Sequence, residues 1–286
     1  MNKVAVSDAR SAWKNINCLS GRKATSSLNV ELDGLLRLFR SSFQPEETLQ
    51  SLTEVIGQKD YADDDPRPVT LKLDVTQVIA ALKSLRPNTS PGIDGIPSWV
   101  FKEHSQTLAP AITVIFNKSL ATGIFPVFFK LANVVPVPKC QNPGPNDFRP
   151  ISLLTSLSKV LVRFVLKKCL IPTMAKRMDP RQFAFVPGDG KGTTCALTLL
   201  QHEVLSYLDK QSGAVRMLQV DLCKAFDKAR HSVALTAMGK LGAPSFILKW
   251  LLSYLSGRQM RIKCGTALSD WIPISSNVPQ GTLLAP

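Results

Sequence analysis

The stretch Met217–His231 constrains the fold more than any other part of the chain. Its apolar first half, Met217–Leu222, predicts a short buried strand that delivers Asp221 at its tip. The following residues turn into a predicted helix that runs through Leu235. A carboxylate at a strand end suits a hard cation such as Mg²⁺. The alternative is a turn or helix-cap aspartate, which is common after an apolar run.

Composition and charge indicate a folded protein with a polyanionic partner. Hydrophobic residues make up 44% of the 286 residues and charged residues 20%, which is typical of a globular chain. The net charge of +14 favours nucleic acid over membrane as the partner, with a merely basic surface as the alternative. Residues 130–192 carry eleven Lys and Arg against three Asp, more than half of that excess. Residues 43–70 are acidic, with seven carboxylates against two cations, so we do not expect them to contact phosphate.

The cysteines and the apolar stretches exclude several other classes of protein. The six cysteines form no C-x-x-C pair and have no histidine at ligand spacing, so we expect neither zinc nor a disulfide framework. This cysteine usage and the polar N-terminus predict an intracellular protein, in the cytoplasm or the nucleus. Residues 111–138 and 151–171 are the most apolar, but Lys, Arg or Pro interrupts each, and no membrane span is expected.

Apolar periodicity and turn residues predict a mixture of helices and strands. We expect helices over 76–85, 151–170, 193–208 and 241–256, together with a helical pair broken at Pro110 and ended by Gly123. Short strands are expected over 134–137 and 259–264. Pro136 and Pro138 lack a backbone donor, which predicts that the first of these strands lies at a sheet edge.

The helix expected over 151–170 carries a basic stripe. Lys159, Arg163 and Lys167 recur every four residues, opposite an apolar face. Such a stripe is usually a solvated helix face. Within a strongly basic region, contact with a nucleic-acid backbone is an equally good interpretation.

Five blocks of sequence, in this order, resemble the reverse transcriptases of non-LTR (LINE-type) retrotransposons. They are Phe129-Lys-Leu-Ala-Asn-Val-Val-Pro-Val-Pro-Lys139, Asp147-Phe-Arg-Pro-Ile-Ser-Leu-Leu154, Gln182-Phe-Ala-Phe-Val-Pro-Gly188, Met217–His231 and Ser276-Asn-Val-Pro-Gln-Gly-Thr-Leu-Leu-Ala-Pro286. The resemblance runs from about Leu71 to Pro286, and five ordered blocks are more specific than any single one.

The resemblance implies an α+β fold, the polymerase right hand. Residues 1–70 are then an N-terminal connector with a partly helical and an acidic part. Residues 71–286, with a core over 120–286, form the fingers and the first part of the palm. The chain is expected to end before the second catalytic carboxylate motif and the thumb. Tyr61-Ala-Asp-Asp64 spells that motif, but its acidic, proline-bearing surroundings cannot form the flanking strands, and we interpret it as a coincidence.

The resemblance also assigns roles at a two-metal site. Asp221 is expected to bridge two Mg²⁺ ions, with the backbone carbonyl of Leu222 as a further ligand. Phe226 is expected to sit under the sugar of the incoming nucleotide and to exclude a 2′-hydroxyl. Plain core packing is the alternative for Phe226.

Four further residues are expected to bind the incoming nucleotide. Arg149 presents a guanidinium fork that suits phosphate, and Lys139 a point charge. Gln280 is expected to contact the nucleotide, while Gly281 lets the backbone approach closely. A simple turn is the alternative for the Pro-Gln-Gly block.

The implied function is RNA-directed DNA synthesis, with an RNA template, a DNA primer and deoxynucleoside triphosphates as partners. The sequence leaves the oligomeric state open. One carboxylate cannot hold two Mg²⁺ ions, so we expect this chain alone to be inactive. Two alternatives remain open: a nucleic-acid-binding remnant without catalysis, and a protein like the maturases of group II introns.

Overall fold

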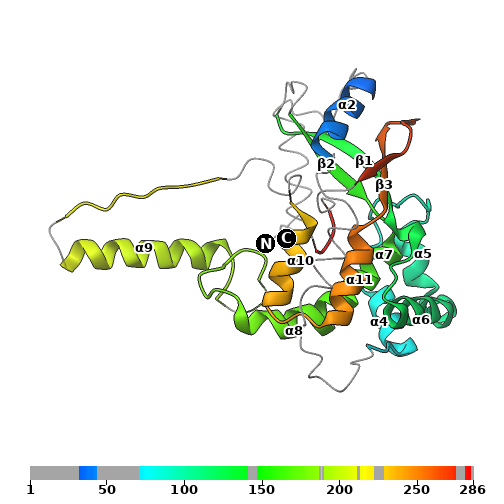
Figure 1. The fold of residues 1–286 in the computed structure, drawn as a ribbon, viewed down its shortest axis with the longest axis horizontal. Coiled ribbons are helices and arrows are strands. Elements are labelled where there is room, and N and C mark those ends of the chain that lie inside the picture. Colours follow the sequence, from blue (N-terminus) through cyan, green and yellow to red (C-terminus); the bar gives the residue numbers. More distant parts are fainter. Residues whose placement is uncertain are drawn as a thin grey trace, which may run out of the picture.

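The computed structural model describes residues 32–43, 71–140, 147–186, 188, 190–210, 213–221, 229–274 and 281–284. A twisted sheet lies at one end of the molecule, and helices gather below it (Figure 1). The sheet is formed by β1 (Leu131–Pro138), β2 (Phe148–Leu153), β3 (Arg258–Cys264), β4 (Ala267–Leu268) and β5 (Ile272–Ile274). The helices are α2 (Leu32–Phe43), α4 (Val75–Lys83), α5 (Ser98–Glu103), α6 (Ser105–Thr122), α7 (Ser156–Val165), α8 (Ile171–Met174), α9 (Thr193–Lys210), α10 (His231–Lys240) and α11 (Ser245–Leu255).

Three short helical turns complete the described elements. The 3₁₀ turn η1 (Val127–Lys130) leads into β1, and η3 (Ala175–Arg177) follows α8. Between α7 and α8 the chain adopts a π-helical turn, η2 (Leu166–Leu170). The mixed helix-and-sheet content agrees with the expected α+β class.

Strand β1 lies between β2 and β3 and joins two parts of the chain that are distant in sequence. It pairs antiparallel with β2 and parallel with β3. Only Leu131–Val134 pair with β3. Pro136 and Pro138 therefore lie in the part of β1 that, among the described strands, pairs with β2 alone. The edge position predicted from the prolines is therefore confirmed for this part of the strand.

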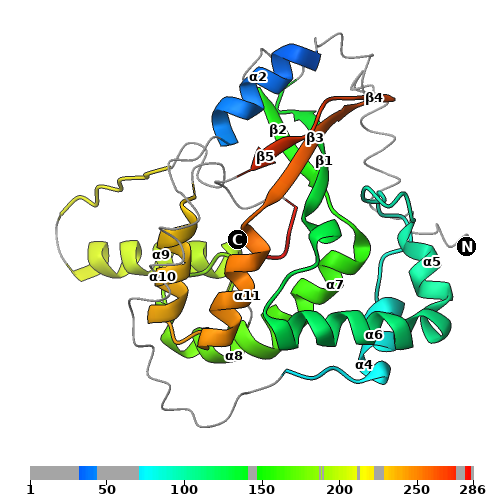
Figure 2. The same ribbon diagram turned by 45° about the vertical axis from the view of Figure 1, so that its right-hand side comes forward.

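The two faces of the sheet differ because side chains alternate along each strand. One face buries Val134, Phe148, Met260 and Ile262 under α2 (Figure 2), which contributes Leu35 and Phe39. The opposite face carries polar side chains, among them Arg261, whose Nε donates to Asn133 Oδ1 at 2.8 Å.

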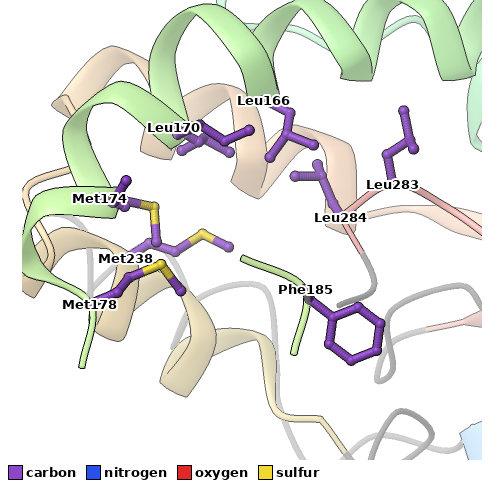
Figure 3. A pocket seen from close by; sticks show the side chains of 10 residues that line it. Leu166, Leu170, Met174, Met178, Phe185, Met238, Leu283 and Leu284 are labelled. Atoms are coloured by element: carbon purple, nitrogen blue, oxygen red, sulfur yellow. The ribbon is translucent and has the colours of Figure 1, made fainter. Parts of the chain in front are cut away.

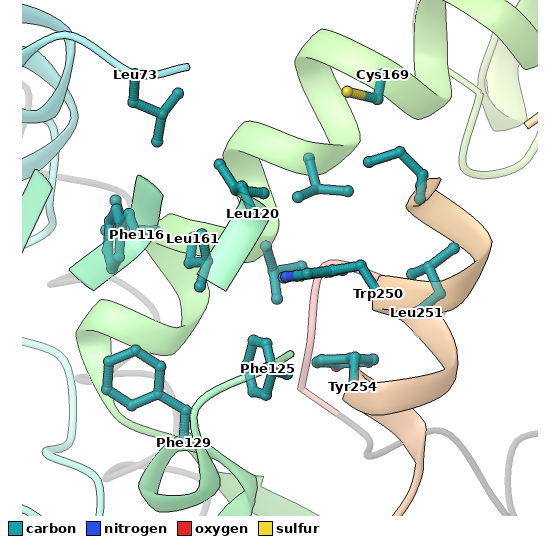
Figure 4. Packing of buried hydrophobic residues seen from close by; sticks show 14 of the residues in the cluster. Leu73, Phe116, Leu120, Phe125, Phe129, Leu161, Cys169, Trp250, Leu251 and Tyr254 are labelled. Atoms are coloured by element: carbon teal, nitrogen blue, oxygen red, sulfur yellow. The ribbon is translucent and has the colours of Figure 1, made fainter. Parts of the chain in front are cut away.

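The larger core lies among the helices and is centred on an aromatic cluster. Phe125 meets Trp250 and Tyr254 edge-on, at ring-centroid distances of 5.2 and 5.0 Å (Figure 4). Trp250 and Tyr254 stack on each other. The indole N–H of Trp250 donates to Ser119 Oγ at 3.0 Å, so its one polar atom has a partner inside the core.

Two boundaries expected from the sequence are wrong. Residues 151–153 belong to β2, and the helix begins only after Thr155, whose Oγ1 accepts a bond from the Ser158 N–H at 3.2 Å. An apolar run suits a strand as well as a helix, and here pairing with β1 decides between them.

The second wrong boundary is the break at Pro110. Pro110 lies inside α6, and the break falls at His104 instead. Pro110 and Gln106 are both exposed, so the Gln106 carbonyl that loses its helical bond can face water. Gly123 ends α6 in the left-handed conformation, as expected.

Candidate nucleotide and nucleic-acid site

The β1–β2 hairpin places two candidate phosphate ligands on one face. Arg149 pairs directly opposite Val137, and the Lys139 N–H extends the ladder by donating to the Asp147 carbonyl at 2.8 Å. Because side chains two residues apart share a face, Lys139 and Arg149 project to the same side of the hairpin. Both are exposed. The hairpin thus presents two cations together, although they are ten positions apart in the sequence.

Gly281 lies against the same strand. Its φ is 102°, and a Cβ at this position would be 3.2 Å from the Ser152 carbonyl oxygen. A side chain at this position would therefore be strained in its backbone and tight against β2. Gln280 lies outside the described residues. Arg149 thus belongs to β2, and Gly281 packs against the same strand.

The segment around Asp221 differs from the expectation. Residues 213–221 have no regular secondary structure, and Asp221 is exposed. Met217, Leu218 and Val220 are 70%, 88% and 74% exposed, so the buried strand predicted over 217–222 is wrong for its described part. A strand needs a neighbour for its backbone groups, and none of the described strands pairs with this segment.

Figures 1 and 2 show the segment, in yellow, apart from the β1–β2 hairpin in both views. Asp221, at the end of this segment, is exposed. Leu222 and Phe226 lie outside the described residues. The helix expected to follow is present as α10.

The three residues of the predicted basic stripe, which lie on α7 and η2, have different surroundings. Arg163 Nη1 donates to Ser84 Oγ at 3.1 Å, which ties α7 to the end of α4. Lys159 is half-buried near Asp94, whereas Lys167 is exposed. Of these three residues, Lys167 is therefore the one best placed for a nucleic-acid backbone.

The loop before α5 contains contacts that sequence reasoning missed. Ser98 Oγ and Ser156 Oγ lie 2.7 Å apart in the interior, and Thr89 Oγ1 bonds Ser98 as well. Gly92 packs so closely on α7 that an added Cβ would lie 2.5 Å from the Thr155 backbone nitrogen. The loop before α5 therefore packs against the N-terminus of α7, a contact for which the sequence gives no signal.

Burial perturbs the two charged groups at this contact. It raises the pKa of Asp94 above its ordinary 3.8, and hydrogen bonds from backbone N–H groups and the charge of Lys159 offset only part of that effect. Burial likewise lowers the pKa of Lys159 from its ordinary 10.5, against the opposing charge of Asp94. Each group is thus held closer to its neutral form than in water.

An apolar pocket of about 220 Å³ lies between η2, α8 and the segment 281–284. Its lining includes Leu166, Leu170, Met174, Met238 and Leu283 (Figure 3). All of its lining side chains are uncharged, so it does not suit a triphosphate.

The described residues do not assemble a complete metal site. Within them, no group of three or more His, Cys, Asp or Glu side chains is placed to hold a metal ion. Of the two predicted metal ligands, Asp221 alone lies in the described part of the chain, and a single carboxylate does not fit two ions. In the same part of the chain, no helix is long and apolar enough to cross a membrane.

Residues 137–286, just over half of the chain, match the family described as Reverse transcriptase (RNA-dependent DNA polymerase). The chain belongs to the reverse transcriptase family. The matched region contains the end of β1, all of β2, the basic stripe, Asp221 and Gly281. The resemblance inferred from the ordered sequence blocks is confirmed.

Reverse transcriptases of mobile elements are its curated relatives. The chain is 26% identical to the probable RNA-directed DNA polymerase from transposon BS of Drosophila melanogaster over 97% of its length, and 30% identical to that from transposon X-element over 85%. It is 29% identical to the RNA-directed DNA polymerase from mobile element jockey of Drosophila funebris over 77%. It covers 29%, 27% and 23% of these three relatives, so it spans less than a third of each.

Proposed function

We propose that the chain is the fingers and the first part of the palm of a non-LTR retrotransposon reverse transcriptase. Its substrates are then an RNA template, a DNA primer and deoxynucleoside triphosphates, with Mg²⁺ as the cofactor. The family match over 137–286 carries this proposal. The β1–β2 hairpin supports it, because Lys139 and Arg149 share an exposed face there.

In this proposal the hairpin receives the triphosphate. Arg149 binds phosphate oxygens in a bidentate manner, and Lys139 adds a second positive charge. Gly281 lies against β2, and its neighbour in sequence, Gln280, contacts the same nucleotide. Asp221, Leu222 and Phe226 retain their proposed roles at the metal ions and the sugar.

Binding of a fluorescent deoxynucleoside triphosphate, followed by anisotropy, tests the hairpin assignment. We expect Arg149→Met to weaken binding at least about tenfold, since a charge-assisted bidentate contact contributes roughly 1.5–3 kcal/mol. Lys263→Met is the matched control, because Lys263 is also an exposed cation of the sheet but lies on β3. Equal losses in the two variants would refute the assignment.

Primer extension on an RNA template tests catalysis separately. We expect no incorporation by this chain alone, because its described residues assemble no second carboxylate pair beside Asp221. Incorporation that Asp221→Asn abolishes would overturn the proposed inactivity and establish Asp221 as a catalytic ligand.

A further inference from the structure

Arg258 is a buried cation at the junction of α11 and β3. Its side chain is 1% exposed. Nη1 donates to the Tyr254 carbonyl at 3.0 Å, and the guanidinium carbon lies 4.8 Å from the centre of the Tyr254 ring. Nε and Nη2 are buried and have no acceptor.

The two unpartnered nitrogens lie on the same edge of the guanidinium. Nε–H and one N–H of Nη2 point in parallel, and this edge is the one that binds two oxygens of a phosphate or carboxylate at once. Buried N–H groups are nearly always bonded in proteins, and a buried charge without an acceptor is costly. This edge of the guanidinium is therefore able to bind an oxyanion.

A second cation and a buried hydroxyl lie near Arg258. Parallel pairing of Leu131 with Gln259 brings Lys130, the residue before β1, next to Arg258. Burial and the charge of Arg258 both lower the pKa of Lys130. The Tyr254 hydroxyl is buried and also lacks a partner. Burial lowers the pKa of Arg258, and Tyr254 opposes part of that effect.

We propose that Arg258, Lys130 and Tyr254 form a binding site for a phosphate group. Neither cation has a carboxylate partner in the described part of the chain, so the site carries two positive charges that match a phosphate dianion. The guanidinium edge binds two oxygens, while the ammonium and the hydroxyl bind the others. Lys130 is only half-buried, and the phosphate enters from its side. The site is distinct from the hairpin face of Lys139 and Arg149.

Thermal unfolding of the full chain in sodium phosphate, compared with sodium chloride at equal ionic strength, tests the site. A ligand that binds only the folded state raises the Tm as its concentration rises. We expect a saturable increase of at least about 3 °C. Lys130→Gln should raise the phosphate concentration needed for half of that increase about tenfold. Lys263→Gln, which removes an equal charge from an exposed position on β3, should leave it unchanged.

Two results would overturn the proposal: no phosphate-specific increase in the wild type, or equal losses in the Lys130 and Lys263 variants. Arg258→Lys keeps the charge but removes the fork, and it should weaken the phosphate effect further. If Arg258→Lys does not fold, the comparison of Lys130→Gln with Lys263→Gln still tests the proposal.

The source of the phosphate is identified by repeating the titration with a deoxynucleoside triphosphate and with an RNA oligonucleotide. The ligand class is identified by the probe that raises the Tm at the lowest concentration and whose effect Lys130→Gln weakens. The titration with free phosphate depends neither on nucleotide binding at the hairpin nor on primer extension, so it tests the site even if both of those fail.

Discussion

Gly92→Ala tests the close packing of the loop before α5 against the N-terminus of α7. The new Cβ would lie 2.5 Å from the Thr155 nitrogen, 2.6 Å from its Cα and 2.8 Å from the Leu154 carbonyl carbon. These are backbone atoms at the N-terminus of a buried helix, so they cannot rotate away. The loop itself must move by about 1 Å to restore ordinary contact near 3.5 Å.

The expected cost follows from these contacts. Overpacking typically costs about 1–3 kcal/mol. Displacement of the loop also stretches the buried Ser98–Ser156 hydrogen bond, which contributes about 1 kcal/mol. We expect a loss of about 3 kcal/mol in the free energy of unfolding, measured as a lower urea midpoint at an unchanged slope.

Two other glycines provide matched controls. Gly34 lies in α2 with nothing within 4 Å of an added Cβ, so Gly34→Ala should stabilise by about 0.5–1 kcal/mol. Gly95 has a φ of +67° and equal space, so Gly95→Ala should cost only about 1–2 kcal/mol of backbone strain. A Gly92→Ala variant as stable as the wild type, or no less stable than Gly95→Ala, would refute the close contact.

Two further changes test the core and the charged contact. Trp250→Phe should lower the free energy of unfolding by about 2 kcal/mol, because it leaves a cavity and removes the donor to Ser119, whereas Trp271→Phe at the surface should cost under about 1 kcal/mol. Equal urea midpoints for both variants would contradict the packing. The folded chain holds the proton of Asp94 to a higher pH than the unfolded chain, so its stability should fall as the pH rises just above 3.8. Asp94→Asn should remove that fall, so the difference in free energy of unfolding between this variant and the wild type should change between about pH 4 and pH 6. A difference that stays constant over this range in urea titrations would refute the prediction.

The sequence by itself determined the family and most of the helices. Five ordered blocks resemble those of reverse transcriptases, and the family match over residues 137–286 confirms that resemblance. Helices α4, α9 and α11 and strand β3 lie close to where periodicity, caps and glycines predict them. These signals are local: they depend on residues within one or two turns of one another.

The tertiary structure decided what depends on a distant partner. The apolar run at Ile151 becomes a strand because β1 lies beside it, while the similar run at Met217 stays unpaired among the described strands. The spacing of Lys159 and Arg163 predicted a basic helix face. In the structure Lys159 lies beside Asp94, and Arg163 donates a hydrogen bond to Ser84. Arg258 gave no signal in the sequence at all. Its burial and its two unpartnered N–H groups arise only where α11, β1 and β3 meet, because burial is a property of the neighbours that a residue acquires on folding.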